Sequence, residues 1–101
     1  MIARLWHGWT TPANADPYER LLRTEIFAAI RERHIPGFRG IQLLRRALPD
    51  AVEFVTLMTF ESLEDVRAFA GADYEVAVVP PAARALVLRF DQRSAHYEIR
   101  T

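Results

Sequence analysis

The sequence contains no cysteine, which excludes disulfide bonds, thiolate nucleophiles and cysteine-ligated zinc. It also contains no lysine. All 13 cationic side chains are therefore arginines, and 13 acidic side chains balance them to a formal net charge of zero. A general nucleic-acid binder needs a basic excess to neutralise phosphates. A nucleic-acid partner is therefore not expected.

Long apolar runs are also missing. No stretch approaches the ~20 consecutive apolar residues that a membrane-spanning helix needs. The opening residues, MIARLWHGWT, lack the apolar segment of a secretory signal peptide. We therefore expect a cytoplasmic protein with no membrane partner.

Histidine is scarce, with only His7, His34 and His96 in the chain. They form neither an HxH nor an HExxH arrangement, so no metal site is expected. Their ordinary pKa nevertheless suits proton transfer near neutral pH. His34 is expected to close a helix and to be structural, which leaves His7 and His96 as acid–base candidates.

The composition is that of a small globular protein. Apolar residues make up 50% of the 101-residue chain and charged residues 26%. We expect a single domain over residues 1–101. A chain of this size buries only about 65% of the surface that its unfolded form exposes, so its core is thin. Association with a second copy would relieve that shortage.

The first part of the chain predicts a strand followed by a helix. Residues 2–10 are rich in Ile, Leu, Trp and Thr, which favour a strand. Asp16 can cap a helix whose first position is Pro17, and apolar residues then recur at helical spacing. The helix should end near His34, because an Ile-Pro-Gly sequence follows.

Two strands and a second helix are expected next. Residues 38–46 and 52–60 both favour strands, and the second is apolar on both faces. Ser62 begins a helix that Gly71 ends, with acidic residues in its first turn. A further helical turn is expected over residues 74–79.

The end of the chain completes the pattern. Residues 80–93 have no clear assignment, and residues 94–100 alternate like a final strand. The order strand, helix, strand, strand, helix, strand predicts a ferredoxin-like α+β fold. This fold has a four-stranded antiparallel sheet with both helices on one face. A second copy of the sheet is the simplest cover for the other face.

This order, with the phrases ARLWHG, PGFRG, FESLEDVRAFAG and SAHYEI, resembles the antibiotic biosynthesis monooxygenase family of dimeric α+β barrel proteins. The resemblance covers the whole chain. It implies a homodimer whose two sheets pack face to face, and a pocket between helices and sheet in each subunit. Activities in that superfamily include cofactor-independent oxidation of polycyclic phenols to quinones, oxidative haem degradation, and isomerase or lyase chemistry.

The catalytic residues of these branches carry over poorly. Haem-degrading members use an asparagine, a tryptophan and a histidine, and Trp6, Phe69 and Val79 stand near those positions here. Valine cannot ligate iron, so haem degradation is not expected. Quinone-forming members use an asparagine, a tryptophan and a tyrosine on the second helix. Asp65, Phe69 and Tyr74 match that set only in part.

The opening strand supplies the candidate pocket residues. Strand side chains alternate, so Arg4, Trp6 and Gly8 should share one face, with Leu5, His7 and Trp9 on the other. Trp6 could stack on an aromatic substrate, or it could be core while Trp9 lies at an interface. Arg4 could bind a phenolate or carboxylate, or it could pair with an acidic side chain.

The sequence thus predicts a cofactor-independent monooxygenase of a phenolic or polycyclic aromatic molecule. Trp6, Phe69 and Tyr74 would hold the substrate, with Arg4 or His96 as its polar partner. The alternative is a non-catalytic dimeric barrel protein that binds a small hydrophobic or aromatic ligand.

Overall fold

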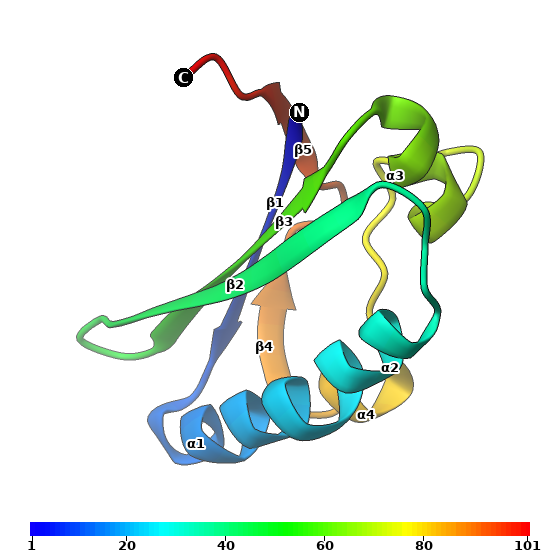
Figure 1. The fold of residues 1–101 in the computed structure, drawn as a ribbon. Coiled ribbons are helices and arrows are strands. Elements are labelled where there is room, and N and C mark those ends of the chain that lie inside the picture. Colours follow the sequence, from blue (N-terminus) through cyan, green and yellow to red (C-terminus); the bar gives the residue numbers. More distant parts are fainter.

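Three long antiparallel strands form the body of the sheet. The computed structural model describes residues 1–101. Strand β1 (Ile2–Thr10) pairs with β3 (Val52–Phe60), which in turn pairs with β2 (Phe38–Ala47) (Figure 1). The sequence predicted all three strands. β3 is central because its β-branched and aromatic residues suit a strand that has neighbours on both edges.

The fourth place in the sheet is shared by two short strands. β4 (Val87–Phe90) pairs with the end of β1, and β5 (Ala95–Glu98) pairs with its beginning. The strand predicted over residues 94–100 is confirmed as the shorter β5, whereas β4 lies in the segment 80–93, which had no clear assignment from the sequence. Residues 92–94 do not pair with β1, because their backbone forms hydrogen bonds with residues 75–77 instead. The amide of Ala77 donates to the carbonyl of Gln92, and the amide of Ser94 donates to the carbonyl of Glu75.

The first helical segment begins earlier than predicted. Helix α1 (Pro12–Leu21) starts after Thr11, whose side chain accepts the amide of Asn14 at 3.1 Å. The expected start at Asp16 was wrong, because Thr11 and Pro12 already supply a cap and a first helical residue. A π-helical turn, η1 (Leu22–Ile26), follows, and α2 (Phe27–Glu32) then ends close to the expected His34.

The predicted start and end of the second helix are confirmed. Helix α3 (Leu63–Ala70) is capped by Ser62 and followed by Gly71, whose φ of +97° favours glycine. The helical turn expected over residues 74–79 was wrong, because only Tyr74 and Glu75 form a turn and Val76 then pairs with Arg93. The turn occurs instead as α4 (Pro81–Arg84), whose start is set by consecutive prolines.

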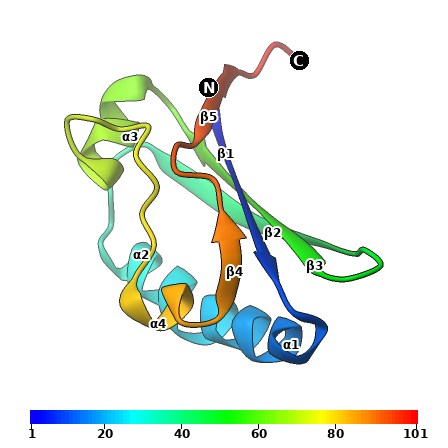
Figure 2. The same cartoon turned by 180° about the vertical axis from the view of Figure 1, so that it is seen from behind.

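The helices all lie on one side of the sheet (Figures 1 and 2). One core cluster joins the sheet to α1 and α2 around Phe54 and Tyr18, whose rings meet edge to face at 4.9 Å. A second joins it to α3 around Phe60, Val66 and Phe69. The predicted ferredoxin-like α+β class is therefore confirmed. No helix has the length and apolar character needed to cross a membrane.

Candidate functional site

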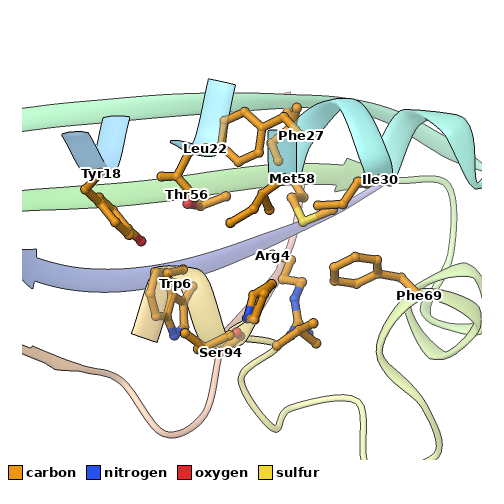
Figure 3. Close-up of a pocket in the computed structure, with 16 residues that line it drawn as sticks. Arg4, Trp6, Tyr18, Leu22, Phe27, Ile30, Thr56, Met58, Phe69 and Ser94 are labelled. Atoms are coloured by element: carbon orange, nitrogen blue, oxygen red, sulfur yellow. The ribbon is translucent and has the colours of Figure 1, made fainter. Parts of the chain in front are cut away.

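A mainly apolar pocket lies between the inner face of the sheet and the helices (Figure 3). The centres of water molecules can reach about 60 Å³ of it, whereas pockets for drug-sized ligands measure about 300–1,000 Å³. As it stands, the pocket is therefore small. Its lining comprises Arg4, Trp6, Tyr18, Leu22, Ile26, Phe27, Ile30, Ile41, Thr56, Met58, Phe69, Val78, Val79, Pro80, Ala83 and Ser94.

Strand alternation places the opening residues as the sequence predicted. Arg4 and Trp6 point into the pocket. The Trp6 indole Nε1 donates to the carbonyl of Asp91 at 2.9 Å, and the far edge of its ring covers Gly8. A Cβ atom at Gly8 would lie 2.8 Å from that ring, so glycine is required for the close approach. Trp9 lies on the opposite face, stacked on His7.

Arg4 is the charged group of the pocket and is only 3% exposed. Its Nη1 donates to the carbonyl of Tyr74 and to Nε2 of His96 at 3.0 Å, and its Nη2 donates to the carbonyl of Val76 at 3.2 Å. Its guanidinium also lies 5.4 Å from the centre of the Phe69 ring. Burial lowers the pKa of Arg4 to about 10, so it stays cationic at neutral pH. None of its partners is a carboxylate.

The ring of His96 stands behind Arg4, because the two residues are paired across β1 and β5. An arginine can only donate, so Nε2 of His96 accepts and the proton of the neutral ring sits on Nδ1. Burial, and then the charge of Arg4, lower the pKa of His96, while Glu75 acts in the opposite direction. His96 is therefore neutral at pH 7. Its buried Nδ1 has no partner in the chain.

Three polar lining residues were not singled out from the sequence. Ser94 is 5% exposed, and its buried hydroxyl has no partner. Tyr18 is buried in the core, and its hydroxyl points across the pocket toward Trp6 (Figure 3). Burial raises the pKa of Tyr18, so it remains a neutral phenol. Thr56 lines the pocket from β3. The spacing of these three residues in the sequence does not predict a shared site, because only folding brings them together.

The other candidate residues lie in different places. Phe69 lines the pocket, with Arg4 and Arg33 each about 5 Å from its ring centre. Tyr74 does not line it; its ring meets His96 edge to face at 5.0 Å. His7 faces the other side of the sheet, where its Nδ1 lies 2.9 Å from Asp91. The structure therefore gathers Arg4, Trp6 and Phe69 in one pocket, with His96 behind Arg4.

Acid is expected to destabilise the protein through His96. Because its pKa is lowered below 6.5 in the folded state, the unfolded chain binds this proton at higher pH than the folded chain does. The free energy of unfolding should therefore fall as the pH drops below about 6.5. Thermal unfolding between pH 7.5 and 5 would measure this loss. The variant His96→Gln, whose side-chain oxygen can still accept from Arg4, should lose less; equal losses would contradict the assignment.

Comparisons with known proteins bear on the fold. No protein-family model matches the sequence, and no curated protein sequence matches it. The structure of a putative antibiotic biosynthesis monooxygenase from Bacillus cereus superposes with a TM-score of 0.68 at 14% identity, covering 99% of this chain and 93% of that one.

The heme-degrader MhuD from Mycobacterium tuberculosis, with two hemes in its active site, gives a TM-score of 0.60 at 21% identity. That match covers 98% of this chain and 95% of MhuD. A mutant of MhuD with two manganese protoporphyrin IX groups per active site gives 0.57 at 23% identity, over 98% and 94% of the chains. This chain therefore has the fold of the antibiotic biosynthesis monooxygenases, as the phrases in its sequence predicted.

Proposed function

We propose that the protein is a cofactor-independent monooxygenase that acts on a phenolic aromatic molecule. The observation that carries this proposal is the apolar pocket with a buried, cationic Arg4 that has no acidic partner. Convergent polar groups in an apolar pocket are typical of a small-molecule site. The cavity suits a single ring, and a polycyclic substrate requires its lining side chains to move apart.

The chemistry needs only the substrate and oxygen. The phenolate passes one electron to O₂, and the resulting superoxide and phenoxyl radical combine to a peroxide anion. This anion takes up a proton, which balances the one that the phenol lost, and loss of water from the hydroperoxide leaves a quinone. One oxygen atom of O₂ enters the quinone and the other leaves as water. Arg4 stabilises the phenolate, since a fixed cation in a water-poor site favours the charged form. Trp6 and Phe69 hold the ring against the cation.

Haem degradation is not the function that we propose. The lining of the pocket contains no histidine, and Val79 stands near the position where the resemblance places one. Tyr18 keeps its proton, because burial raises its pKa, and a protonated phenol is a poor iron ligand. The small cavity also argues against a haem.

We also propose a homodimer that packs through the uncovered face of the sheet. Alternation and strand register place Leu5, Leu57, Val55 and Leu44 side by side on this face. Leu44 and Tyr97 are 48% and 57% exposed there. A two-fold axis would bury the same patch on both copies, together with His7 and Gln42, which lie beside it. The helices and the pocket stay accessible on the opposite side.

Tryptophan fluorescence and oxygen uptake, followed together during titration with phenols, test the enzymatic proposal. The two tryptophans lie on opposite faces, so Trp9→Phe is a matched control for Trp6→Phe. A substrate should quench the wild type and Trp9→Phe, but not Trp6→Phe, and oxygen should be consumed. Quenching without oxygen uptake would favour the alternative, a ligand-binding protein. Quenching that depends on Trp9 alone would contradict the pocket assignment.

A further inference from the structure

Arg4 still has donors to offer a ligand. A guanidinium carries five N–H groups, and the chain accepts three of them, through the carbonyls of Tyr74 and Val76 and the ring of His96. The Nε–H and one Nη2–H have no acceptor in the chain. All three protein acceptors are uncharged. A buried cation that lacks a carboxylate is costly, because solvation is lost without a compensating charge.

Ser94 adds a third unused donor to the two on Arg4. Its hydroxyl is buried, is unpartnered and belongs to the pocket lining. Figure 3 shows Arg4, Ser94 and Trp6 along one side of the pocket, across from the helical residues Leu22 and Phe27. Buried polar groups are hydrogen-bonded as a rule, so the unpartnered hydroxyl of Ser94, in a pocket that also holds the unused N–H groups of Arg4, points to a missing acceptor.

We propose that Arg4 and Ser94 form a carboxylate-binding subsite, and that the ligand of the pocket is a small aromatic acid. The two carboxylate oxygens accept the free Nε–H and Nη2–H of Arg4, and the hydroxyl of Ser94 donates to one of them. The ring of the acid then lies in the apolar part of the pocket. This inference rests on the proposed function only in placing the ligand in the same pocket.

A carboxylate fits this subsite better than a phenol oxygen alone. Carboxylic acids ionise near pH 4 and reach the protein as anions, whereas a phenol with a pKa near 10 must first lose a proton. A carboxylate also has two oxygens for donors on two nitrogens. In an aromatic acid hydroxylated next to its carboxylate, Arg4 binds the carboxylate and the phenol oxygen stays beside the same cation, as the proposed mechanism requires.

The roles of His96 and Tyr74 follow from this arrangement. Both are positioning residues: the ring of His96 and the backbone carbonyl of Tyr74 occupy the Nη1 donors of Arg4. The guanidinium is thereby held with its remaining donors free. A neutral His96 is needed for this, since a protonated ring has no lone pair for Arg4.

Binding of benzoate and of its neutral isostere benzamide tests the subsite at pH 7. We expect benzoate to bind at least ten-fold more tightly, as measured by calorimetry or ligand-observed NMR. Ser94→Ala should weaken benzoate several-fold and benzamide less, because the hydrogen bond to the carboxylate is the stronger one, and Arg4→Gln should abolish the preference. Ser94→Ala removes only an unpartnered hydroxyl, so it keeps the test valid even if Arg4→Gln fails to fold.

Arg33→Gln is the matched control, because Arg33 lies against the same Phe69 ring but is exposed. It should keep the preference for benzoate. Equal binding of the two probes, no binding of benzoate at millimolar concentration, or loss of the preference in Arg33→Gln would overturn the proposal. Oxygen uptake with a simple phenol separates the two proposals. If the protein oxidises a simple phenol but binds benzoate no better than benzamide, only the carboxylate subsite is refuted. If it prefers benzoate but oxidises no hydroxylated aromatic acid, only the monooxygenase activity is refuted.

Discussion

Replacing Phe54 with alanine should lower the free energy of unfolding by about 3–5 kcal/mol. Phe54 is fully buried near the start of β3, and its ring packs edge to face on Tyr18. The truncation removes this aromatic contact and leaves a cavity between the sheet and α1. A domain of this size has about 5–15 kcal/mol of stability in all, so the variant should be marginal.

Urea denaturation at a fixed protein concentration measures the effect of Phe54→Ala, because any coupling to dimerisation then stays constant. Leu88→Ala is the matched control. Leu88 is 57% exposed on β4, and its truncation should change the free energy of unfolding by no more than about 0.5 kcal/mol. A loss below 1 kcal/mol in Phe54→Ala would show that the contact between sheet and helix is not the main core of the protein.

Replacing Leu57 with glutamate should convert the proposed homodimer into monomers. Leu57 lies on the uncovered face of β3, directly between Leu5 on β1 and Gln42 on β2. In a two-fold interface the substitution occurs twice, so two carboxylates lose water without gaining a cation. At about 2 kcal/mol or more for each, or about 4 kcal/mol in all, dissociation should become roughly 1,000-fold easier.

Sedimentation velocity measures this change directly, and circular dichroism checks that the variant Leu57→Glu is folded. Ala29→Glu is the control, because Ala29 is exposed on the helical side of the protein, where no second copy is proposed. It should leave the dimer intact. A folded Leu57→Glu protein that still sediments as a dimer would mean that the two copies meet elsewhere, and a monomeric wild type would refute the homodimer itself.

Local chemistry accounts for the parts of the fold that were predictable. Alternation alone put Arg4 and Trp6 on the pocket face of β1, and the Ser62 and Gly71 signals marked both ends of α3. The start of α1 was missed because Asp16 and the proline after it imitate a helix start. That proline, Pro17, is tolerated inside the helix because Ala13, whose carbonyl would otherwise accept its amide, is exposed to solvent.

Long-range contacts account for what the sequence could not show. The interruption between β4 and β5 depends on backbone hydrogen bonds to residues 75–77, and no local sequence pattern predicts these bonds. The direction of the Tyr18 hydroxyl and the isolation of the Ser94 hydroxyl are likewise set by the assembled pocket. Arg4 was a candidate from its strand alone, but the absence of an acidic partner, on which the carboxylate proposal depends, is visible only in the folded chain.

The π-helical turn η1 has a consequence for how the shape of this pocket can change. The amide of Phe27 donates to the carbonyl of Leu22, five residues back, so both side chains reach the pocket. In a regular α-helix each residue turns the chain by about 100°. Deleting one residue from this turn would therefore rotate the pocket-lining side chains of α1 about the helix axis relative to those of α2. Insertion or deletion of a single residue in η1 can therefore change the shape of the pocket without any substitution among the residues that line it.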